Sequence, residues 1–278
     1  MVQETDPQEI HFRNDLQNLE LSGLLFMPTG NGPFPAVVII HGSGDSSRQN
    51  KWYLTYVHHL VDHGIVVLLP DKRGSESSGG NWRNSSFEDL ATDSVAAVNY
   101  LSKRDDLNIS SLGLLAISQG GWIAPIAASN SSDVSFIVNI VGTSVKAHEQ
   151  LLYEEGHNLK KMGLPYGLAR VVSHMSSFWL RKVSQSNFWK AIGNFDPIPY
   201  WRRIEIPTLV LYGSDDTNVP SHESKIRFDN LHKDNITVKI FEGSGHALQD
   251  PAGQGKTYIR QEVLEEVSDF IDSIVATR

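Results

Sequence analysis

The chain is expected to adopt an α/β fold, in which helices cover both faces of a mostly parallel sheet. Short, continuous apolar runs such as residues 35–42 and 65–71 are typical of strands that are buried on both faces. These runs alternate along the chain with helical patterns, and a strand that connects to the next one through a helix runs parallel to it. A length of 278 residues fits one large domain of this class or two small ones. We assign residues 1–278 to a single domain.

The strands are predicted from β-rich segments that are bounded by turn residues. Residues 8–14 and 19–28 are joined by the turn-rich residues 14–18 and predict an antiparallel hairpin at the start of the fold. The later strands are expected at residues 35–42, 65–71, 111–118, 134–142, 207–213 and 236–243.

Helical patterns follow most of these strands. Residues 51–64 carry apolar side chains at helical spacing and end at Gly64, a glycine C-cap. Ser86, with Asp89 three residues later, predicts a capping box at the start of the next helix. The other helices are expected at residues 86–104, 118–128, 222–232 and 257–275.

A long segment interrupts the alternation of strands and helices. Residues from about 143 to 204 carry many aromatic side chains among Lys and Glu, and they lack strand periodicity. We predict that this segment is a helical cap inserted over the carboxyl edge of the sheet; the alternative is a set of helices packed on the flank. Ligand pockets are mostly apolar, so aromatic residues are expected to bind the substrate. The expected substrate-binding residues are Trp122, Phe178, Trp179, Phe188 and Trp189.

Composition and charge exclude several classes of function. The sequence has 24 Lys and Arg against 32 Asp and Glu, a net charge of −8, which gives no basic surface for nucleic acid. It contains no cysteine, so disulfides, thiolate metal sites and a cysteine nucleophile are excluded. His59 and His63 have a spacing that metal ligands use, but no carboxylate motif accompanies them, and no metal site is assigned.

The sequence predicts little about location and assembly. No apolar run reaches the roughly 18 residues that a membrane-spanning helix needs. Residues 1–10 show neither the basic nor the apolar region of a secretory signal. We therefore expect a cytoplasmic protein, or a periplasmic or secreted one if a signal peptide has been removed. The oligomeric state is left open.

The candidate nucleophile is Ser118, which directly follows a buried strand and precedes Gly120 and Gly121. A nucleophilic serine at such a strand-to-helix turn has its hydroxyl exposed above the sheet, and small neighbours are needed because other backbone passes close by. The start of the following helix supplies oriented N–H groups, among them the amide of Gln119, for a developing oxyanion. The alternative is that Ser118 only caps this helix.

A second candidate element, His41-Gly42-Ser43-Gly44, follows the strand at residues 35–42. Its glycines allow the backbone to turn and to approach a substrate carbonyl. The amide of Ser43 is then the expected second donor to the oxyanion. The alternative is an ordinary turn.

The candidate acid and base lie after the last two strands. A serine hydroxyl needs a neutral imidazole to accept its proton, and that imidazole needs a carboxylate to fix its tautomer. Asp215 and Asp216 follow the strand at residues 207–213, and His246 follows the next strand. We prefer Asp216 to Asp215, and the resulting order of Ser118, Asp216 and His246 is found in one fold class.

The segments 32–44, 71–80 and 196–220, together with the turn at Ser118, resemble the α/β-hydrolase superfamily, and the resemblance covers nearly the whole chain. More narrowly, they are similar to bacterial serine esterases of the dienelactone-hydrolase-like branch, which is related to the prolyl-oligopeptidase group. The resemblance implies an eight-stranded, mostly parallel sheet, a cap between strands six and seven, a Ser–His–Asp triad, an oxyanion hole and no cofactor.

The expected function is that of a carboxylic ester hydrolase that acts on small-molecule esters with small or medium acyl groups. The reaction is expected to pass through an acyl-enzyme on Ser118. The preference for esters over amides rests on the resemblance. A peptidase or amidase of the same fold is one alternative, and a non-catalytic ligand-binding protein is another.

The sequence departs from the family pattern at two positions. Ala116 stands where the first glycine of G-x-S-x-G is usual, a change that adds one methyl group and should be tolerated. Glu76 stands where D-x-R-G-x-G has its last glycine. Either Glu76 is strained in a conformation that suits glycine, or the loop has adapted and Glu76 pairs with Arg73. We expect the adapted loop.

Overall fold

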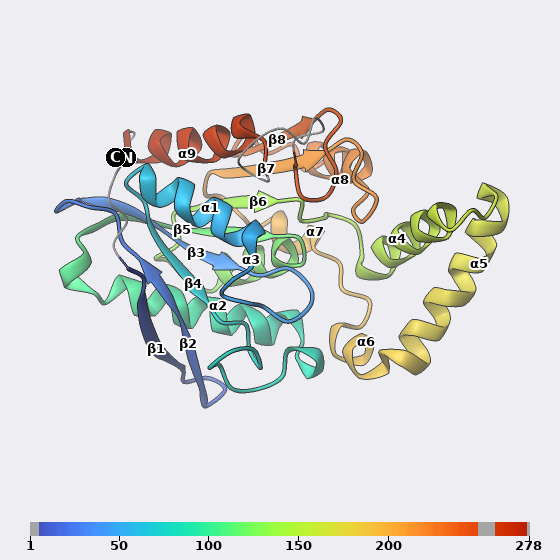
Figure 1. The fold of residues 1–278 in the computed structure, drawn as a ribbon, viewed down its shortest axis with the longest axis horizontal. Helices are drawn as coiled ribbons and strands as arrows, with labels where there is room; N and C mark the ends of the chain where they lie inside the picture. Colours follow the sequence, from blue (N-terminus) through green and yellow to red (C-terminus); the bar gives the residue numbers. More distant parts are fainter. Residues whose placement is uncertain (1–5, 250–258, 277–278) are drawn as a thin grey trace.

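The computed structural model describes residues 6–249 and 259–276. Its eight-stranded sheet has the order β1-β2-β4-β3-β5-β6-β7-β8 (Figure 1). The two strands of the entry hairpin, β1 and β2, are antiparallel, and β2 is also antiparallel to its neighbour β4. The six strands β4, β3, β5, β6, β7 and β8 are parallel to one another. The strands are β1 Gln8–Asn14, β2 Leu19–Phe26, β3 Phe34–Ile40, β4 Val66–Pro70, β5 Ile109–Ile117, β6 Phe136–Ile140, β7 Thr208–Gly213 and β8 Ile236–Phe241.

The helices occupy the segments between the strands, as the sequence predicts. They are α1 Lys51–Asp62, α2 Phe87–Ser102, α3 Gly120–Ser129, α4 Ala147–Lys161, α5 Tyr166–Trp179, α6 Ser186–Ile192, α7 Ile198–Trp201, α8 Ser221–Asp229 and α9 Gln261–Ala276, with short 3-10 turns at Trp82–Asn84 and Asp105–Leu107 and a π turn at Leu180–Ser184. The capping box is present: Asp89 donates its N–H to the Ser86 hydroxyl, and Ser86 donates its N–H to the Asp89 carboxylate. The expected start of the last helix, at Thr257 and Tyr258, lies outside the described residues.

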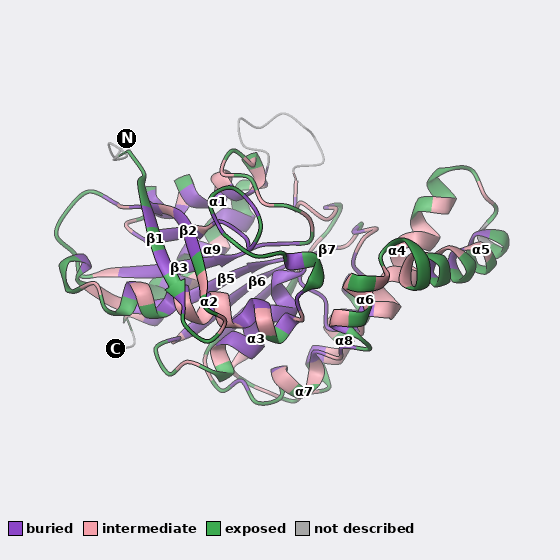
Figure 2. Ribbon diagram, turned by 90° about the horizontal axis from the view of Figure 1, so that it is seen from below, coloured by how far each residue is buried: buried purple, intermediate pink, exposed green. Residues whose placement is uncertain are grey.

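The sheet separates two hydrophobic layers (Figure 2). In β3, Val37 and Ile39 belong to the layer that α1 and α9 cover, whereas Val38 and Ile40 belong to the layer of α2 and α3. Successive side chains of a strand point to opposite faces, so a strand buried on both faces must be apolar throughout. This burial explains the continuous apolar run of β3. The α/β class and the eight-stranded, mostly parallel sheet are confirmed.

The loops that carry the candidate site residues leave the same edge of the sheet. Ser43 follows β3, Ser118 follows β5, Asp216 follows β7, and His246 follows β8. Parallel strands end at one common edge, so residues that are far apart in the sequence are brought together there. Within residues 6–249 and 259–276, no helix combines the length and the apolar character that a membrane span requires.

The inserted segment between β6 and β7 is helical. In Figure 1, α4, α5 and α6 extend away from the body of the molecule, and we call these residues, 147–192, the helical arm. Apolar side chains of α5 face solvent, among them Leu168, Val171 and Met175. A cap over the active site therefore stays a prediction, and so does the assignment of one domain.

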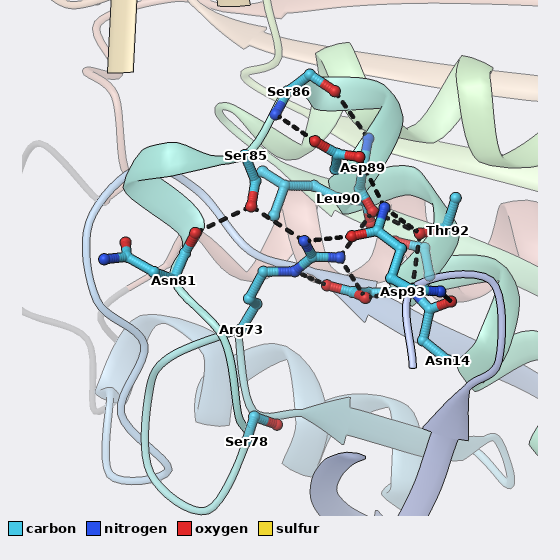
Figure 3. A network of polar contacts seen from close by, with 12 residues as sticks. Asn14, Arg73, Ser78, Asn81, Ser85, Ser86, Asp89, Leu90, Thr92 and Asp93 are labelled. Atoms are coloured by element: carbon cyan, nitrogen blue, oxygen red, sulfur yellow. Dashed lines mark hydrogen bonds and ion pairs between the residues drawn. The ribbon is translucent and has the colours of Figure 1, made fainter. Parts of the chain in front are cut away.

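The loop after β4 is fixed by a buried arginine (Figure 3). Arg73 donates from Nε and Nη2 to the two carboxylate oxygens of Asp93, each at 2.8 Å. It also donates to the side chains of Gln17 and Ser85 and to the carbonyl of Asp89, at 2.7, 3.0 and 3.1 Å. A guanidinium has five donors in a fixed geometry, which suits this number of partners. The loop is thus bound to the entry hairpin and to α2 at once.

The expected pairing of Arg73 with Glu76 is wrong, because Asp93 of α2 takes the guanidinium. The nearby Asp71 is paired with Arg48, at 2.9 and 2.8 Å. The Glu76 carboxylate instead accepts the backbone N–H of Arg48 at 3.2 Å. Its φ of 47° lies in the left-handed region that favours glycine. The loop has therefore kept the glycine-like conformation in spite of the substitution.

Glu76→Gly is expected to stabilise the protein by up to about 1 kcal/mol, because glycine adopts a positive φ without the steric cost of a Cβ atom. Urea unfolding of the wild type and the variant measures the gain. Glu76→Ala is the control: it keeps the Cβ atom and should show no gain. A loss of stability in Glu76→Gly that becomes smaller at high salt would contradict this expectation.

Candidate active site

Ser118, His246 and Asp216 form a continuous series of hydrogen bonds. The distance from Ser118 Oγ to His246 Nε2 is 3.0 Å, and that from His246 Nδ1 to Asp216 Oδ2 is 2.8 Å. The Asp216 side chain is fully buried, whereas His246 is 20% exposed. A serine, an imidazole and a buried carboxylate in this order are the parts of an activated serine nucleophile.

The structure brings Asp216, and not its neighbour Asp215, to the imidazole. The second oxygen of Asp216, Oδ1, accepts the backbone N–H groups of Asn218 and Val219 at 2.8 and 2.9 Å. These bonds fix the carboxylate within the loop after β7. Asp215 is exposed and accepts the hydroxyl of Ser214. The tight turn of the loop thus selects one of two adjacent aspartates.

The turn at Ser118 requires close approach of the backbone. Ser118 has a φ of 52°, a conformation in which non-glycine residues are strained. A Cβ atom added to Gly120 would lie 2.4 Å from the carbonyl oxygen of Ile40, which is backbone and cannot move aside easily. Ala116, by contrast, is fully buried within β5. The second small position of the motif is therefore restricted to glycine, whereas the first accommodates a methyl group.

The loop after β3 lies against the nucleophile. A Cβ atom added to Gly42 would be 3.3 Å from Ser118 Cβ. The hydroxyl of Tyr53 accepts the N–H of Gly42 at 2.9 Å and so binds this loop to α1. Among the described residues, the amides of Ser43 and Gln119 have no hydrogen-bond acceptor. Both amides are thus available to a ligand, and their role as an oxyanion hole stays a prediction.

A pocket of about 180 Å³, open in part to solvent, is lined by Ser118 and His246. Its lining residues are His41, Gly42, Ser43, Gly44, Asp45, Ser46, Asn50, Trp52, Tyr53, Ser118, Asn218 and His246. The pocket combines backbone donors, small hydroxyls and two aromatic rings. Such a surface suits a compact, polar group with a short apolar part.

Burial shifts the pKa values of three groups in or beside this pocket. It lowers the pKa of Lys72 to about 7 and the pKa of His41 to about 4, because both groups lose hydration of their charged forms. Burial raises the pKa of Tyr53 to about 12 for the same reason. His41 is therefore neutral at pH 7, with Nε2 bonded to the carbonyl of Pro70.

The structure places the five aromatic residues expected to bind the substrate outside the lining of this pocket. Trp122 lies in the core, with its ring centroid 5.1 Å from that of Phe87, because α3 packs on α2. Phe178 and Trp179 are 58% and 55% exposed on the helical arm. The other two, Phe188 and Trp189, are half-buried where the arm meets the body.

Trp52 and Tyr53, in the first turn of α1, were not predicted as site residues from the sequence. The Trp52 ring lies 5.6 Å from the His246 ring, in an edge-on arrangement, and Tyr53 holds the loop after β3. Their position directly after the loop of the His-Gly-x-Gly motif is a signal that could have identified them. The helical periodicity instead suggested that Tyr53 is a core residue, which it also is.

Two further residues were missed because their partners are remote in the sequence. Lys72 reaches the loop after β3 and Gln119 of the nucleophile turn. Tyr153 of α4 donates its hydroxyl to the backbone carbonyl of Asp216 at 2.8 Å. Nothing in the local sequence around either residue indicates these contacts.

Among the residues that the structure describes, His, Cys, Asp and Glu side chains form no group of three or more that is placed to hold a metal ion. His59 and His63 do lie together on α1, with ring centroids 4.0 Å apart. His63 Nδ1 contacts the backbone carbonyl of His59 at 2.7 Å.

Comparison with known proteins gives a family and several relatives. The family model described as BAAT / Acyl-CoA thioester hydrolase C terminal matches residues 95–263, a range that contains Ser118, Asp216 and His246. Esterase EstD of Thermotoga maritima is 22% identical over an alignment of 287 residues, which covers 96% of this chain and 68% of the esterase. The peroxisomal succinyl-coenzyme A thioesterase of Mus musculus is 26% identical, over 82% of this chain and 52% of the thioesterase. The chain thus spans about half the length of that relative.

Solved structures share the fold. A Pyrococcus furiosus esterase superimposes on this chain with a TM-score of 0.73 at 18% identity, and the superposition covers 97% of this chain and 91% of the esterase. The fold is therefore that of the α/β-hydrolases.

Gly120→Ala is expected to destabilise the protein by about 2 to 3 kcal/mol, because the added methyl group overlaps the backbone of β3. Gly156→Ala is the matched control, since a Cβ atom at Gly156 on α4 meets nothing within 4 Å. That control should be stabilised by about 0.5 to 1 kcal/mol through helix propensity. Urea unfolding of both variants checks the pair, and equal stabilities would refute the close approach at Gly120.

Proposed function

Because this chain belongs to the family described as BAAT / Acyl-CoA thioester hydrolase C terminal, we propose that it is a serine hydrolase that cleaves carboxylic esters. The proposed substrates are esters of small or medium acyl groups, and the proposed reaction passes through an acyl-enzyme. The observation that carries the proposal is the hydrogen-bonded series of Ser118, His246 and Asp216 within a pocket open to solvent.

In the proposed first half-reaction, Ser118 Oγ attacks the ester carbonyl while His246 Nε2 accepts its proton. Asp216, bonded to Nδ1, stabilises the resulting imidazolium. The carbonyl oxygen becomes an oxyanion and accepts the N–H groups of Ser43 and Gln119. His246 then returns the proton to the leaving alcohol, and the C–O bond breaks to give acyl-Ser118.

The second half-reaction repeats these steps with water in place of the serine hydroxyl. His246 accepts a proton from the water, whose oxygen attacks the acyl carbon and forms a second tetrahedral intermediate. The intermediate collapses, Ser118 Oγ leaves with the proton from His246, and the carboxylic acid is released. Apart from the ester and the water, the groups that act in these steps are side chains and backbone amides of the chain.

A thioester is a second candidate substrate, since the family description and the mouse relative both name acyl-CoA or thioester hydrolysis. The same acyl-enzyme forms, with a thiol as leaving group. One observation favours a simple ester over a coenzyme A thioester. The chain carries a net charge of −8, which repels a polyanion.

One panel of substrates tests the proposal against its alternatives. It contains p-nitrophenyl esters of increasing chain length, acyl-CoA thioesters and aminoacyl-p-nitroanilides. We expect turnover of the short and medium esters with the highest kcat/KM. Dominant anilide hydrolysis would indicate a peptidase or amidase. Release of one equivalent of p-nitrophenol without turnover would favour a ligand-binding protein.

Ser118→Ala is expected to lower kcat by at least about 1000-fold, because covalent catalysis is lost. Its melting temperature should stay close to that of the wild type. Asp216→Asn should lower kcat far more than the matched control Asp215→Asn, because only Asp216 orients the imidazole. Steady-state kinetics with a p-nitrophenyl ester check both statements. More than a tenth of wild-type activity in Ser118→Ala, or the reverse ranking of the aspartates, would contradict the assignment.

Selectivity for the acyl chain is proposed to depend on the base of the helical arm. Phe188 lies edge-on to Trp82, with ring centroids 5.7 Å apart, and Trp82 in turn lies under Lys72 beside the loop after β3. Phe188→Ala should therefore shift the preferred ester chain length by at least two carbons. Phe178→Ala, whose side chain is exposed on α5, is the control and should leave it unchanged.

The second matched pair is Trp189→Ala with Trp179→Ala as control. Relative kcat/KM values across the ester series, measured together with melting temperatures, decide the outcome. If Phe188→Ala and Trp189→Ala lower the melting temperature and leave the preference unchanged, these aromatic residues serve packing and the acyl chain binds elsewhere.

A further inference from the structure

Lys72 is a buried lysine that lies between the loop after β3 and the start of α3. The residue as a whole is only 7% exposed. Nζ donates to the carbonyl of Gly42 at 2.7 Å, to the carbonyl of Gly44 at 3.2 Å and to Oε1 of Gln119 at 2.9 Å. An ammonium group has three N–H donors, so these three acceptors use all of them.

Each of these bonds holds a group that adjoins a proposed oxyanion donor. The Gly42 carbonyl and the Ser43 N–H belong to the same peptide group, which is planar and trans, so they point in opposite directions. When Lys72 holds the Gly42 oxygen, it therefore directs the Ser43 N–H away from itself. The bond to the Gly44 carbonyl fixes the peptide group between Gly44 and Asp45, two peptide groups further along the loop. The bond to Gln119 fixes the side chain of the residue that carries the second amide.

We propose that Lys72 is a positioning residue that holds the two donors of the oxyanion hole at the separation that one substrate oxygen requires. This inference rests on the proposed function of Ser118 as nucleophile. Lys72 touches no reacting atom, and its effect on the reaction is exerted through the amides of Ser43 and Gln119.

The neighbours of Lys72 fix its direction. Asp71 is bound to Arg48, and Arg73 is bound to Asp93. Since both flanking residues are anchored to other parts of the fold, the lysine between them has little freedom to turn away. The backbone N–H of Lys72 also donates to the hydroxyl of Ser46 at 3.0 Å.

The surroundings of Lys72 make this arrangement sensitive to pH. The charged and titratable groups that face it from other segments are Asp45, Arg83 and His41. Burial outweighs the attraction of Asp45 and lowers the pKa of Lys72 to about 7, and Arg83 acts in the same direction. A neutral amine has two N–H donors, so one of the three acceptors loses its bond above that pH. The oxyanion hole should therefore loosen as the solution becomes alkaline.

Lys72→Met removes the three bonds and keeps most of the length of the apolar part of the side chain. We expect kcat for a p-nitrophenyl ester to fall about 10- to 100-fold, less than the loss for deletion of an oxyanion donor itself, and KM to change less than about threefold. The inhibition constant of a trifluoromethyl ketone, which forms an oxyanion on the serine, should rise by the same factor by which kcat/KM falls. The wild-type kcat should decline as pH rises through about 7 to 9, and the variant should lack this decline.

Arg83→Met is the matched control. Like Lys72, Arg83 lies over the Trp82 ring, with its guanidinium 4.5 Å from the ring centroid. It pairs with the carboxylate of Asp45 in the loop after β3 but bonds neither the Gly42 nor the Gly44 carbonyl. Loss of this cation should change kcat less than about twofold. An equal fall in both variants would show a general effect of positive charge and overturn the positioning role.

Gln119→Met is a milder variant that removes one acceptor of Lys72 and keeps the backbone amide. We expect a fall in kcat of about three- to tenfold, and this variant decides the question if Lys72→Met does not fold. A folded Lys72→Met or Gln119→Met with wild-type kcat and inhibitor affinity would overturn the positioning role of Lys72 and leave the proposed function intact. If the wild type itself fails to turn over esters, or if Ser118→Ala retains its activity, the proposed function fails instead.

Discussion

The buried ion pair between Arg73 and Asp93 is the interaction on which the active-site edge depends. It joins the loop after β4 to α2, and the other donors of Arg73 reach the entry hairpin and the turn before α2. Removal of one partner from such a pair leaves an uncompensated buried charge, which costs about 3 to 5 kcal/mol. The geometry of this loop is therefore strongly determined. Because Lys72 is the residue before Arg73, the same pair determines where the lysine points.

The candidate nucleophile Ser118 is positioned by a different means, namely backbone contact. An added Cβ atom would lie 2.4 Å from the carbonyl oxygen of Ile40 at Gly120, and 2.6 Å from the Cα of Gly142 at Gly121. The start of α3 thus rests directly on the ends of β3 and β6. Contacts of this kind leave no freedom for rotamers, so Ser118 is held in its strained conformation by close-packed main chain rather than by side chains.

The fold and the grouping of Ser118, Asp216 and His246 at one edge of the sheet were predictable because their signals are local. Continuous apolar runs mark the buried strands, a period of 3.6 residues marks the helices, and the candidate residues stand where strands end. The choice of Asp216 also followed from its place in the loop. The partner of Arg73 was not predictable, since Asp93 lies on a helix surface where a carboxylate is usually solvated. The burial of Lys72 and the direction of the helical arm depend on packing between remote segments, which no local pattern reports.

The helical arm lies in the connection between β6 and β7, which are parallel neighbours in the sheet. Its two ends meet at the body, where Ala147 donates its N–H to the carbonyl of Phe195 at 3.2 Å. The ends of the arm are therefore held close together, whatever lies between them. The entropy of closing a loop grows slowly with its length, so the insertion can grow, shrink or be replaced at little cost in stability. The residues for chemistry lie outside it, on β3, β5, β7 and β8 and their loops. Under the proposed function, this architecture separates the evolution of substrate range from that of the catalytic groups, and it marks the connection between β6 and β7 as the place where a new binding module can be grafted.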